Sequence, residues 1–396
     1  MKPRRLIVVS EHYQPSSGAT AQLMQDLSRG LAELGWSITV LTATSARPID
    51  DADNRHLVVR LGKQEKAADA TKSMTRKTLA GLRFLCSCFL WCSFRAHRND
   101  LLFIVSNPPF IGLIGPLLKL VRRLRYLFLF QDLFPRSAVL SGVLPSQGFR
   151  TQIWTALMQS ICRYSAATVV LNQAMARRLQ QESSCQLPLT VIHNWAIEQG
   201  SASPRATNPF AIEYGFADRF TIQYSGNFGR LHDMNTLIGA AAQLQNNPQI
   251  QFVFIGGGAK QQDIEQAALG NVLLKPYQPR SRLAETLAAC DLACISLVPG
   301  AENTLAPCKL YGILASGRGL VLIAGNNCDL AQLVQHEKIG VVVAPGNSEL
   351  LAQQLQHLSQ QPEEVAAMGE RAKRVYEECF GFERSLKRYN ELLLSL

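Results

Sequence analysis

Short apolar runs rich in β-branched residues alternate with amphipathic stretches along almost the whole chain. This alternation is typical of parallel sheets whose strands are joined by crossover helices. It predicts seven strands in the first half and six in the second. They lie at Leu6–Ser10, Ser37–Thr42, Leu57–Leu61, Leu101–Val105, Tyr126–Phe130, Ala167–Leu171 and Leu189–Ile192, then at Phe220–Tyr224, Gln251–Ile255, Val272–Leu274, Leu292–Ile295, Leu320–Ile323 and Gly340–Val343.

A stretch without helical or strand periodicity separates the two halves. Residues 193–210 include Gly200, Pro204 and Pro209, which favour turns and interrupt regular structure. A chain of 396 residues is also too long for one hydrophobic core, because single cores stop growing at about 250–300 residues. We therefore expect a first domain over residues 1–200 and a second over residues 201–382.

The end of the chain has the periodicity of two consecutive helices. They are predicted at about Pro362–Cys379 and Glu383–Leu394, with a hinge at Gly381. The second helix, within residues 383–396, is expected to cross back onto the first domain. The pattern as a whole predicts an α/β protein with two Rossmann-like, doubly wound parallel sheets that face each other across an interdomain cleft.

Glycine-rich loops follow several of the predicted strands. Ligands of doubly wound sheets bind beyond the carboxyl ends of the strands, in loops that lead into helices. Three successive glycines, Gly256 to Gly258, lower the stability of a regular strand and favour close approach of a ligand to the backbone. The turn from Gly226 to Arg230 adds a guanidinium that could bind phosphate oxygens in bidentate fashion.

A lysine follows a proline in a third loop of the second half. Pro307 suits the first turn of a helix, where its missing N–H is not needed. The ammonium of Lys309, together with the free amides of this turn, would suit a diphosphate. An ordinary surface lysine is the alternative explanation.

Two loops of the first half have candidate polar groups. The segment from Glu11 to Ala19 contains Ser17 and Gly18 at a helix start, where phosphate could bind or where the chain simply turns. Asp132 follows a predicted strand and is either a carboxylate at the cleft or a helix cap. No dinucleotide-binding fingerprint or Walker loop is present, and no second acid supports the two-carboxylate scheme of glycoside hydrolysis.

Together these segments resemble the family 4 glycosyltransferases of the GT-B fold, particularly the bacterial branch that assembles capsular, exopolysaccharide and O-antigen sugars. The resemblance extends nearly from end to end, and it implies retaining transfer of a hexosyl residue from a UDP-sugar or GDP-sugar, with no metal or other cofactor, to a lipid-linked or glycan acceptor. The segments that carry it are Tyr13–Gly18, Gln131–Leu133, His193–Trp195, Gly226–Arg230, Gly256–Gly258 and Pro307–Gly317.

The resemblance also implies roles for single residues. The catalytic group would be Gln131, Asp132, Arg230 and Lys309. The donor would be bound by Gly18, Gly226, Asn227, Arg230, Gly257, Gly258, Tyr277, Glu302 and Lys309. The acceptor would be bound by Ser17, Gly18 and Asp132.

The chain departs from the family pattern in three places. Many relatives carry two glutamates eight positions apart, where this chain has Thr304 and Gly312, with Glu302 nearby. Gln131 stands where the usual histidine precedes the acid. Asn227 and His232 replace a common arginine and lysine. These differences concern donor choice and catalytic rate.

Positive charge is concentrated in the first half. Residues 1–200 contain 24 Lys and Arg against 12 Asp and Glu, whereas residues 201–396 contain 16 against 18. Residues 72–98 and 118–125 mix these cations with large apolar side chains, a composition typical of helices at an anionic membrane surface. A core-packing helix with solvated arginines is the alternative.

The chain shows no signal peptide, no convincing transmembrane segment and no cysteine spacing that indicates zinc. We therefore expect a cytoplasmic enzyme, peripheral at the inner face of the cytoplasmic membrane, with free thiols. A sugar-nucleotide epimerase of the same fold and a nucleic-acid-binding protein are the alternative functions. Asp51-Ala52-Asp53 resembles a metal motif of other glycosyltransferases, but its polar surroundings favour solvated surface.

Overall fold

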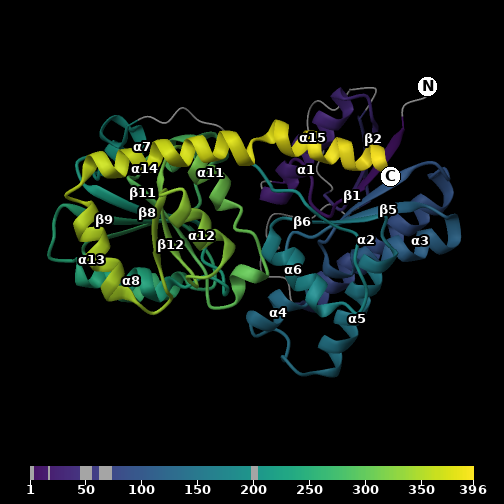
Figure 1. Cartoon of the computed structure of the whole chain (residues 1–396), viewed down its shortest axis with the longest axis horizontal. Coiled ribbons are helices and arrows are strands. Elements are labelled where there is room, and N and C mark those ends of the chain that lie inside the picture. The colour runs from purple at the N-terminus through teal and green to yellow at the C-terminus, as the bar shows by residue number, and fades with distance from the viewer. Residues whose placement is uncertain (1–3, 17, 45–55, 62–73, 198–203) are drawn as a thin grey trace. The chain divides into compact units, whose positions relative to one another are not determined.

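The computed structural model describes residues 4–16, 18–44, 56–61, 74–197 and 204–396. The chain divides into two compact units, one of Met1–His193 with Glu383–Leu396 and the other of Asn194–Phe382. Each unit has a parallel sheet with helices on both faces (Figure 1). Asp51-Ala52-Asp53 and Ser17 lie outside the described residues.

The sheet of the first unit has seven parallel strands in the order β3-β2-β1-β4-β5-β6-β7. The strands are β1 (Arg5–Val9), β2 (Ser37–Thr42), β3 (His56–Arg60), β4 (Leu101–Val105), β5 (Arg125–Leu129), β6 (Ala167–Val170) and β7 (Leu189–Val191). Strand β4 is buried along its whole length, and the central strands are apolar on both faces because helices cover both. The strand order reverses between β1 and β4, which is the switch point of this sheet.

Helices of the first unit pack on both faces of its sheet. They are α1 (Ala19–Glu33), α2 (Met74–Arg95), the 3₁₀ helix η2 (Pro109–Leu113), α3 (Ile114–Arg122), α4 (Arg136–Leu140), α5 (Phe149–Tyr164), α6 (Gln173–Glu182) and α15 (Phe382–Ser395). A Cβ at Gly115 would lie 2.6 Å from the Tyr126 ring, so α3 packs directly on this face of β5. Side chains alternate along a strand, and Phe103 of β4 points to the opposite face.

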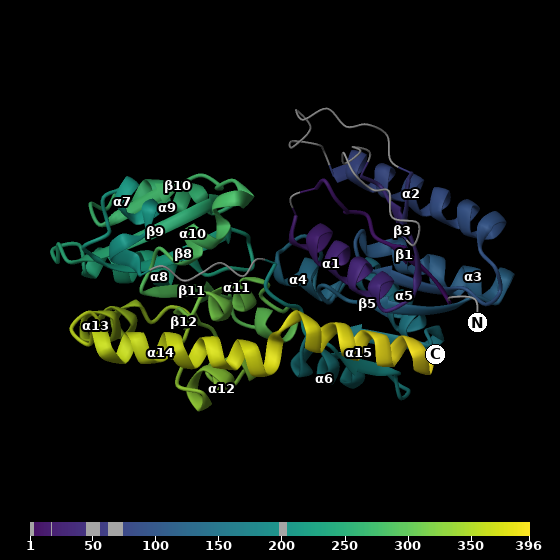
Figure 2. The same cartoon turned by 90° about the horizontal axis from the view of Figure 1, so that it is seen from above.

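The last helix of the chain belongs to this first unit. The ring of Tyr389 on α15 lies 5.7 Å from that of Phe103, centroid to centroid. Trp36 Nε1 donates a hydrogen bond to Asn390 Oδ1 at 2.8 Å. Helix α15 therefore covers the face of the sheet opposite α2 and α3, as Figure 2 shows.

The sheet of the second unit has six parallel strands in the order β10-β9-β8-β11-β12-β13, with its switch point between β8 and β11. The strands are β8 (Phe220–Asn227), β9 (Ile250–Gly257), β10 (Val272–Lys275), β11 (Leu292–Ser296), β12 (Gly319–Ile323) and β13 (Gly340–Val343). This order is that of a doubly wound sheet.

Helices of the second unit also cover both faces. They are α7 (Pro209–Glu213), α8 (Met234–Gln243), α9 (Gln261–Ala267), α10 (Leu283–Leu287), α11 (Lys309–Ala315), α12 (Asp329–His336), α13 (Ser348–Leu358) and α14 (Pro362–Val375), with 3₁₀ turns η3 (Arg205–Thr207), η4 (Arg280–Arg282) and η5 (Ala301–Asn303) and a π turn η6 (Tyr376–Phe380). Leu292 and Cys294 of β11 pack with α8 and α13. Ala293 and Ile295 point the other way and pack with α11 and α12.

The two predicted doubly wound parallel sheets and all thirteen predicted strands are confirmed. Strands β8 and β9 run beyond the predicted ends at Tyr224 and Ile255, because Gly226 and Gly256 still pair in register. Helix α14 is followed by the π turn and by Gly381, after which α15 begins. None of the helices in the described part of the chain has the length and apolar character needed to cross a membrane.

Candidate active site

The carboxyl ends of β8 and β9 lie side by side in the second unit and carry the predicted glycine turns. Gly226 pairs with Gly256 and Asn227 with Gly257. A Cβ at Gly256 would overlap the carbonyl oxygen of Gly226, and Gly256 has a φ of 142°. The two turns are thus packed backbone against backbone at the edge of the sheet where ligands of this fold bind.

The packing of the protein itself explains why two of the three successive positions are glycine. Gly258 has a φ of 145°, and a Cβ there would lie 2.8 Å from the carbonyl oxygen of Phe228. Gly256 is constrained in the same way by Gly226. Gly257 has no such constraint, since a Cβ there would meet Gln261 Oε1 at 3.2 Å and the Tyr277 ring at 3.5 Å. Among the three, Gly257 is therefore the one whose glycine is not already required by the fold, and close approach of a ligand would explain it.

Lys309 begins α11 and lies over the switch point between β8 and β11. Its Nζ is 3.4 Å from the centroid of the Tyr224 ring. A Cβ at Gly226 would lie 2.9 Å from Lys309 Cε, so the absence of a side chain at Gly226 leaves room for the lysine. Pro307 was expected in the first turn of this helix, but it precedes the N-cap residue, Cys308.

The ammonium of Lys309 is buried and makes no hydrogen bond to any described residue. Burial lowers the pKa of Lys309 to about 7, against the opposing effect of the Cys294 and Cys308 thiols. A buried ammonium without hydrogen-bond acceptors is costly, and an anionic ligand would supply both acceptors and opposite charge. The lysine is therefore suited to an anion at the carboxyl edge.

Tyr277 and Glu302 lie at the same edge of the sheet. The hydroxyl of Tyr277, after β10, donates a hydrogen bond to the carbonyl oxygen of Gly257 at 3.2 Å, while 59% of the residue stays exposed. Glu302, after β11, reaches the loop after β12, where a Cβ at Gly325 would lie 3.0 Å from its Oε1. In the order of the strands, the exposed ring of Tyr277 therefore lies on one side of Lys309 and the carboxylate of Glu302 on the other.

Arg230 is exposed in the loop between β8 and α8, and it makes no ion pair or hydrogen bond within the described residues. The structure therefore brings together Gly226, Asn227, Gly257, Gly258, Tyr277, Glu302 and Lys309 at one edge of a sheet, and it places the Arg230 backbone in a loop at that edge without fixing the guanidinium.

His232, Lys260 and Tyr224 were not predicted as site residues. His232 Nδ1 lies 2.8 Å from the carbonyl oxygen of Ser296, and Lys260 Nζ donates to the carbonyl oxygen of His232 at 2.7 Å. Burial and the nearby Lys309 lower the pKa of His232 to about 4. A neutral histidine thus links the turn after β8 to β11. The signals in the sequence were its place after the glycine turn and its replacement of a lysine common in the family.

In the first unit, Gln131 and Asp132 follow β5, next to the switch-point strand β4. The backbone N–H of Gln131 donates to Ser106 Oγ at 3.0 Å, which links the ends of the two strands. Burial raises the pKa of the Asp132 carboxyl, while a hydrogen bond from Ser137 opposes the shift. Asp132 is thus a partly buried carboxyl at the carboxyl edge of the sheet.

Gly18 is the N-cap residue of α1 and also lies at this edge, because its loop follows β1. Its backbone is extended and the space beside it is open, so the fold does not require a glycine there. Arg60 Nη1 donates to the carbonyl oxygen of Gln14 at 2.9 Å, and Tyr13 Oη lies 2.8 Å from His56 Nε2. These contacts hold the loop before Gly18 in place.

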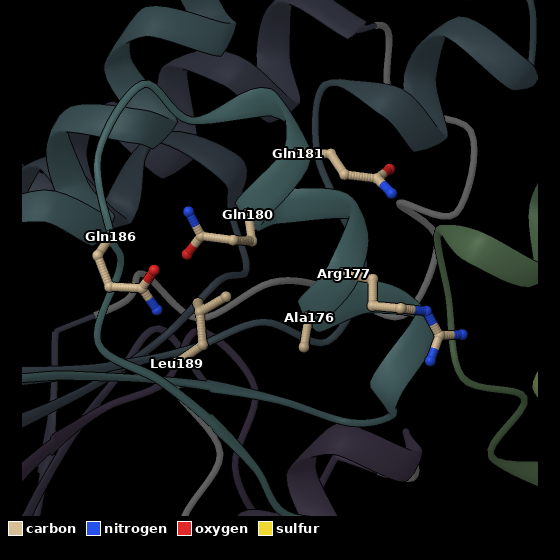
Figure 3. A pocket seen from close by; sticks show the side chains of 6 residues that line it. All are labelled: Ala176, Arg177, Gln180, Gln181, Gln186 and Leu189. Atoms are coloured by element: carbon tan, nitrogen blue, oxygen red, sulfur yellow. The ribbon is translucent and has the colours of Figure 1, made fainter.

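A hollow of about 390 Å³ lies between α6 and β7 in the first unit (Figure 3). The amide of Gln180 already serves the following loop, since it donates to the carbonyl oxygen of Cys185 and accepts from the N–H of Leu187. Figure 3 shows Arg177 and Gln181 directed away from Gln180. The polar groups do not converge, so this hollow is not a candidate site. In the described residues no group of His, Cys, Asp or Glu is arranged to hold a metal.

Comparison with known proteins identifies the class. The model of the glycosyl transferases group 1 family matches residues 213–375, and that of the glycosyl transferase 4-like domain matches residues 18–195. The probable glycosyltransferase WbjE of Pseudomonas aeruginosa is 25% identical over 356 residues, 88% of each chain. The putative colanic acid biosynthesis glycosyl transferase WcaI of Escherichia coli K12 is 33% identical over 135 residues, 33% of each chain.

A solved structure supports the same fold. HepE of Anabaena in complex with UDP-glucose superposes with a TM-score of 0.72 at 16% identity, over 99% of this chain and 100% of that one. Two doubly wound sheets of this kind, with this neighbour, have the GT-B fold. The chain belongs to the group 1, family 4-like glycosyltransferases.

Proposed function

We propose that the protein transfers a hexosyl residue from a nucleoside diphosphate sugar to a lipid-linked or glycan acceptor, with retention of configuration, in surface polysaccharide biosynthesis. The second unit would bind the donor and the first unit the acceptor. The HepE structure contains UDP-glucose, and this supports a UDP-sugar ahead of a GDP-sugar. No metal is needed in this scheme, because protein cations neutralise the diphosphate.

The observation that carries the proposal is the buried, unpaired ammonium of Lys309 over the switch point. As the bond from the sugar to the diphosphate breaks, negative charge grows on the leaving group. A cation held in place by Tyr224 and Gly226 stabilises that charge more in the transition state than in the ground state. Arg230, exposed at the same edge, would supply the second cation.

Other groups at this edge would bind the remaining parts of the donor. The exposed ring of Tyr277 offers a surface on which the base can stack, and Gly257 leaves its backbone open to the ligand. The carboxylate of Glu302 would accept hydrogen bonds from hydroxyl groups, with Asn227, Gly226 and Gly258 shaping the turn. In the first unit, Asp132 and Gln131 would lie beside the reacting sugar, and Gly18 with Ser17 would contact the acceptor or the donor phosphate.

The test is nucleotide binding and turnover in matched variants. UDP, GDP and ADP would be compared by thermal shift, and one of them should stabilise the protein. Lys309→Met and Arg230→Ala should each lower turnover by roughly 10²–10³, the usual effect of removing one transition-state donor. Arg374→Ala, an exposed cation on α14, is the control. Near-normal turnover in both site variants would contradict the assignment.

A second part of the proposal places the protein at the inner face of the cytoplasmic membrane. Helices α2, α3 and α5 contain no aspartate or glutamate. Helices α2 and α3 pack together and expose large apolar side chains, among them Phe94 (82%) and Leu120 (81%). The same two helices and the segments that directly follow them also carry exposed cations, namely Arg76, Arg83, Arg95, Arg98, Lys119, Arg122, Arg123 and Arg125. An acid-free surface of this kind complements anionic lipid headgroups.

A further inference from the structure

The second unit has a cavity of about 590 Å³ at the edge of its sheet opposite the glycine turns. Phe220 at the start of β8, Asp291 just before β11 and Arg318 just before β12 all line it. Strands of this sheet rise about 3.3 Å per residue, so the two edges lie roughly 15–25 Å apart. The cavity is therefore separate from the proposed donor site.

Charges in the cavity are balanced and held in place by the fold. Arg205 Nε donates to Asp291 Oδ2 at 2.7 Å, and the same oxygen accepts from the N–H of Thr221 at 2.7 Å. Arg205 also donates to the carbonyl oxygen of Ala217, and Arg318 Nη1 donates to that of Cys290 at 3.2 Å. Because Asp218 and Asp291 offset the two arginines, the lining has no net positive charge to attract a phosphate.

The rest of the lining offers neutral polar groups together with small apolar faces. Asn247 Nδ2 donates to Gln356 Oε1 at 3.0 Å, which leaves the amide nitrogen of Gln356 available. Gln249 and Gln360 are exposed at the mouth, and Pro362 and Ala366 supply apolar surface beside them. Amides both donate and accept hydrogen bonds, as sugar hydroxyls do, while the C–H faces of a sugar ring match apolar surface.

We infer that this cavity binds an uncharged oligosaccharide. Its volume lies within the usual range of small-molecule sites, about 300–1,000 Å³. The ligand would be a segment of the acceptor or product glycan held away from the reacting end, which would raise the apparent affinity for long chains by a second attachment point. Only this role rests on the proposed function, because binding itself does not require transfer.

The experiment measures binding of neutral trisaccharides by NMR saturation transfer and calorimetry, with maltotriose, cellotriose and laminaritriose as probes and inorganic phosphate as the charged comparison. At least one trisaccharide should bind. The double variant Gln249→Ala with Gln360→Ala should weaken binding about tenfold or more, since each change removes a hydrogen-bonding amide. Ala366→Trp, which fills the cavity from its exposed rim, should do the same.

Controls separate this site from the donor site. Gln353→Ala, an exposed glutamine of α13 outside the lining, should leave trisaccharide binding unchanged, as should Lys309→Met. The cavity variants should keep the nucleotide affinity of the parent. Failure of all three trisaccharides to bind, equal binding in the cavity variants, or phosphate binding that these variants abolish would each overturn the inference. Loss of nucleotide binding alone would contradict only the proposed function.

Discussion

Lys309 and Tyr224 form the closest cation–ring contact in the described part of the second unit, with Nζ 3.4 Å from the ring centroid. A ring face attracts an ammonium but supplies no hydrogen-bond acceptor. The contact therefore positions the ammonium of Lys309 but leaves its hydrogen-bond donors without acceptors. The pKa of Lys309 therefore depends both on its burial and on any anion that binds beside it.

The first prediction concerns pH and stability. Burial lowers the pKa of Lys309 to about 7, whereas the unfolded side chain has a pKa of about 10.4. Between these values the unfolded chain binds a proton that the folded chain lacks, so this residue makes stability rise with pH across that window. Lys309→Met should be more stable than the parent at pH 7, and the difference should shrink toward pH 10.

Urea unfolding of both proteins at several pH values measures that difference directly. Taking the difference removes the contribution of buried thiols that do not interact with Lys309, such as Cys88 and Cys162. The same proton links pH to ligand binding, because a diphosphate favours the charged lysine. UDP affinity of the parent should therefore fall as pH rises above about 7, by up to about tenfold per unit. If the difference in the free energy of unfolding between the parent and Lys309→Met does not change with pH, the lowered pKa assigned to Lys309 is wrong.

The second prediction separates two neighbouring glycines. Gly258→Ala places a Cβ against the carbonyl oxygen of Phe228 at a φ of 145°, and it should cost about 2–4 kcal/mol of the free energy of unfolding. Gly257→Ala meets only the end of Gln261 and the Tyr277 ring, so it should cost less than about 1 kcal/mol. If the donor approaches the Gly257 backbone, Gly257→Ala should still weaken UDP binding. Denaturant unfolding and calorimetry on both variants provide the comparison.

Much of the fold could be predicted because it follows from local patterns. Strands such as β4 and β12 are continuous apolar runs, and such runs can be recognised in the sequence without any contact information. The role of Tyr224 could not be found in this way. Its position in a strand predicts burial, and only the folded structure shows that its ring lies beneath a lysine 85 residues later in the chain.

The same reasoning explains what the sequence could not show in the glycine turn and elsewhere. The sequence shows three glycines in a row, but it does not show that Gly256 and Gly258 make room for the backbone of the turn after β8. The oligosaccharide cavity depends on the pairing of Arg205 with Asp291, which lie 86 residues apart and match no motif. Features built from distant residues leave no local signal.

The third prediction concerns the carboxyl of Asp132. Ser137 donates a hydrogen bond to this carboxyl and favours its ionised form. If transfer requires ionised Asp132, Ser137→Ala should raise the pKa further and move the acid limb of the pH–rate profile to higher pH. Asp132→Asn should lower turnover by about 100-fold while UDP still binds. An unchanged acid limb in Ser137→Ala would mean that the ionisation of Asp132 does not limit the rate of transfer.

The fourth prediction concerns the membrane surface formed by α2 and α3. Phe94→Ser combined with Leu120→Ser should reduce cosedimentation with anionic vesicles by about tenfold or more, because burying each side chain contributes roughly 1.5–3 kcal/mol. Ile212→Ser, which removes an exposed apolar side chain from the second unit, is the matched control. High salt should weaken binding of the parent protein. Equal sedimentation of the double variant and the control would remove the membrane assignment.

The last prediction concerns the attachment of α15 to the first unit. Tyr389 is fully buried against Phe103, yet its hydroxyl has no hydrogen-bond partner among the described residues. Tyr389→Phe keeps the ring and removes the unsatisfied hydroxyl, so it should be neutral or stabilising by up to about 1 kcal/mol. Tyr389→Ala leaves a cavity under the helix and should cost about 3–5 kcal/mol. Denaturant unfolding of both variants decides the point, since a destabilised Phe variant would mean that the hydroxyl is bonded in solution.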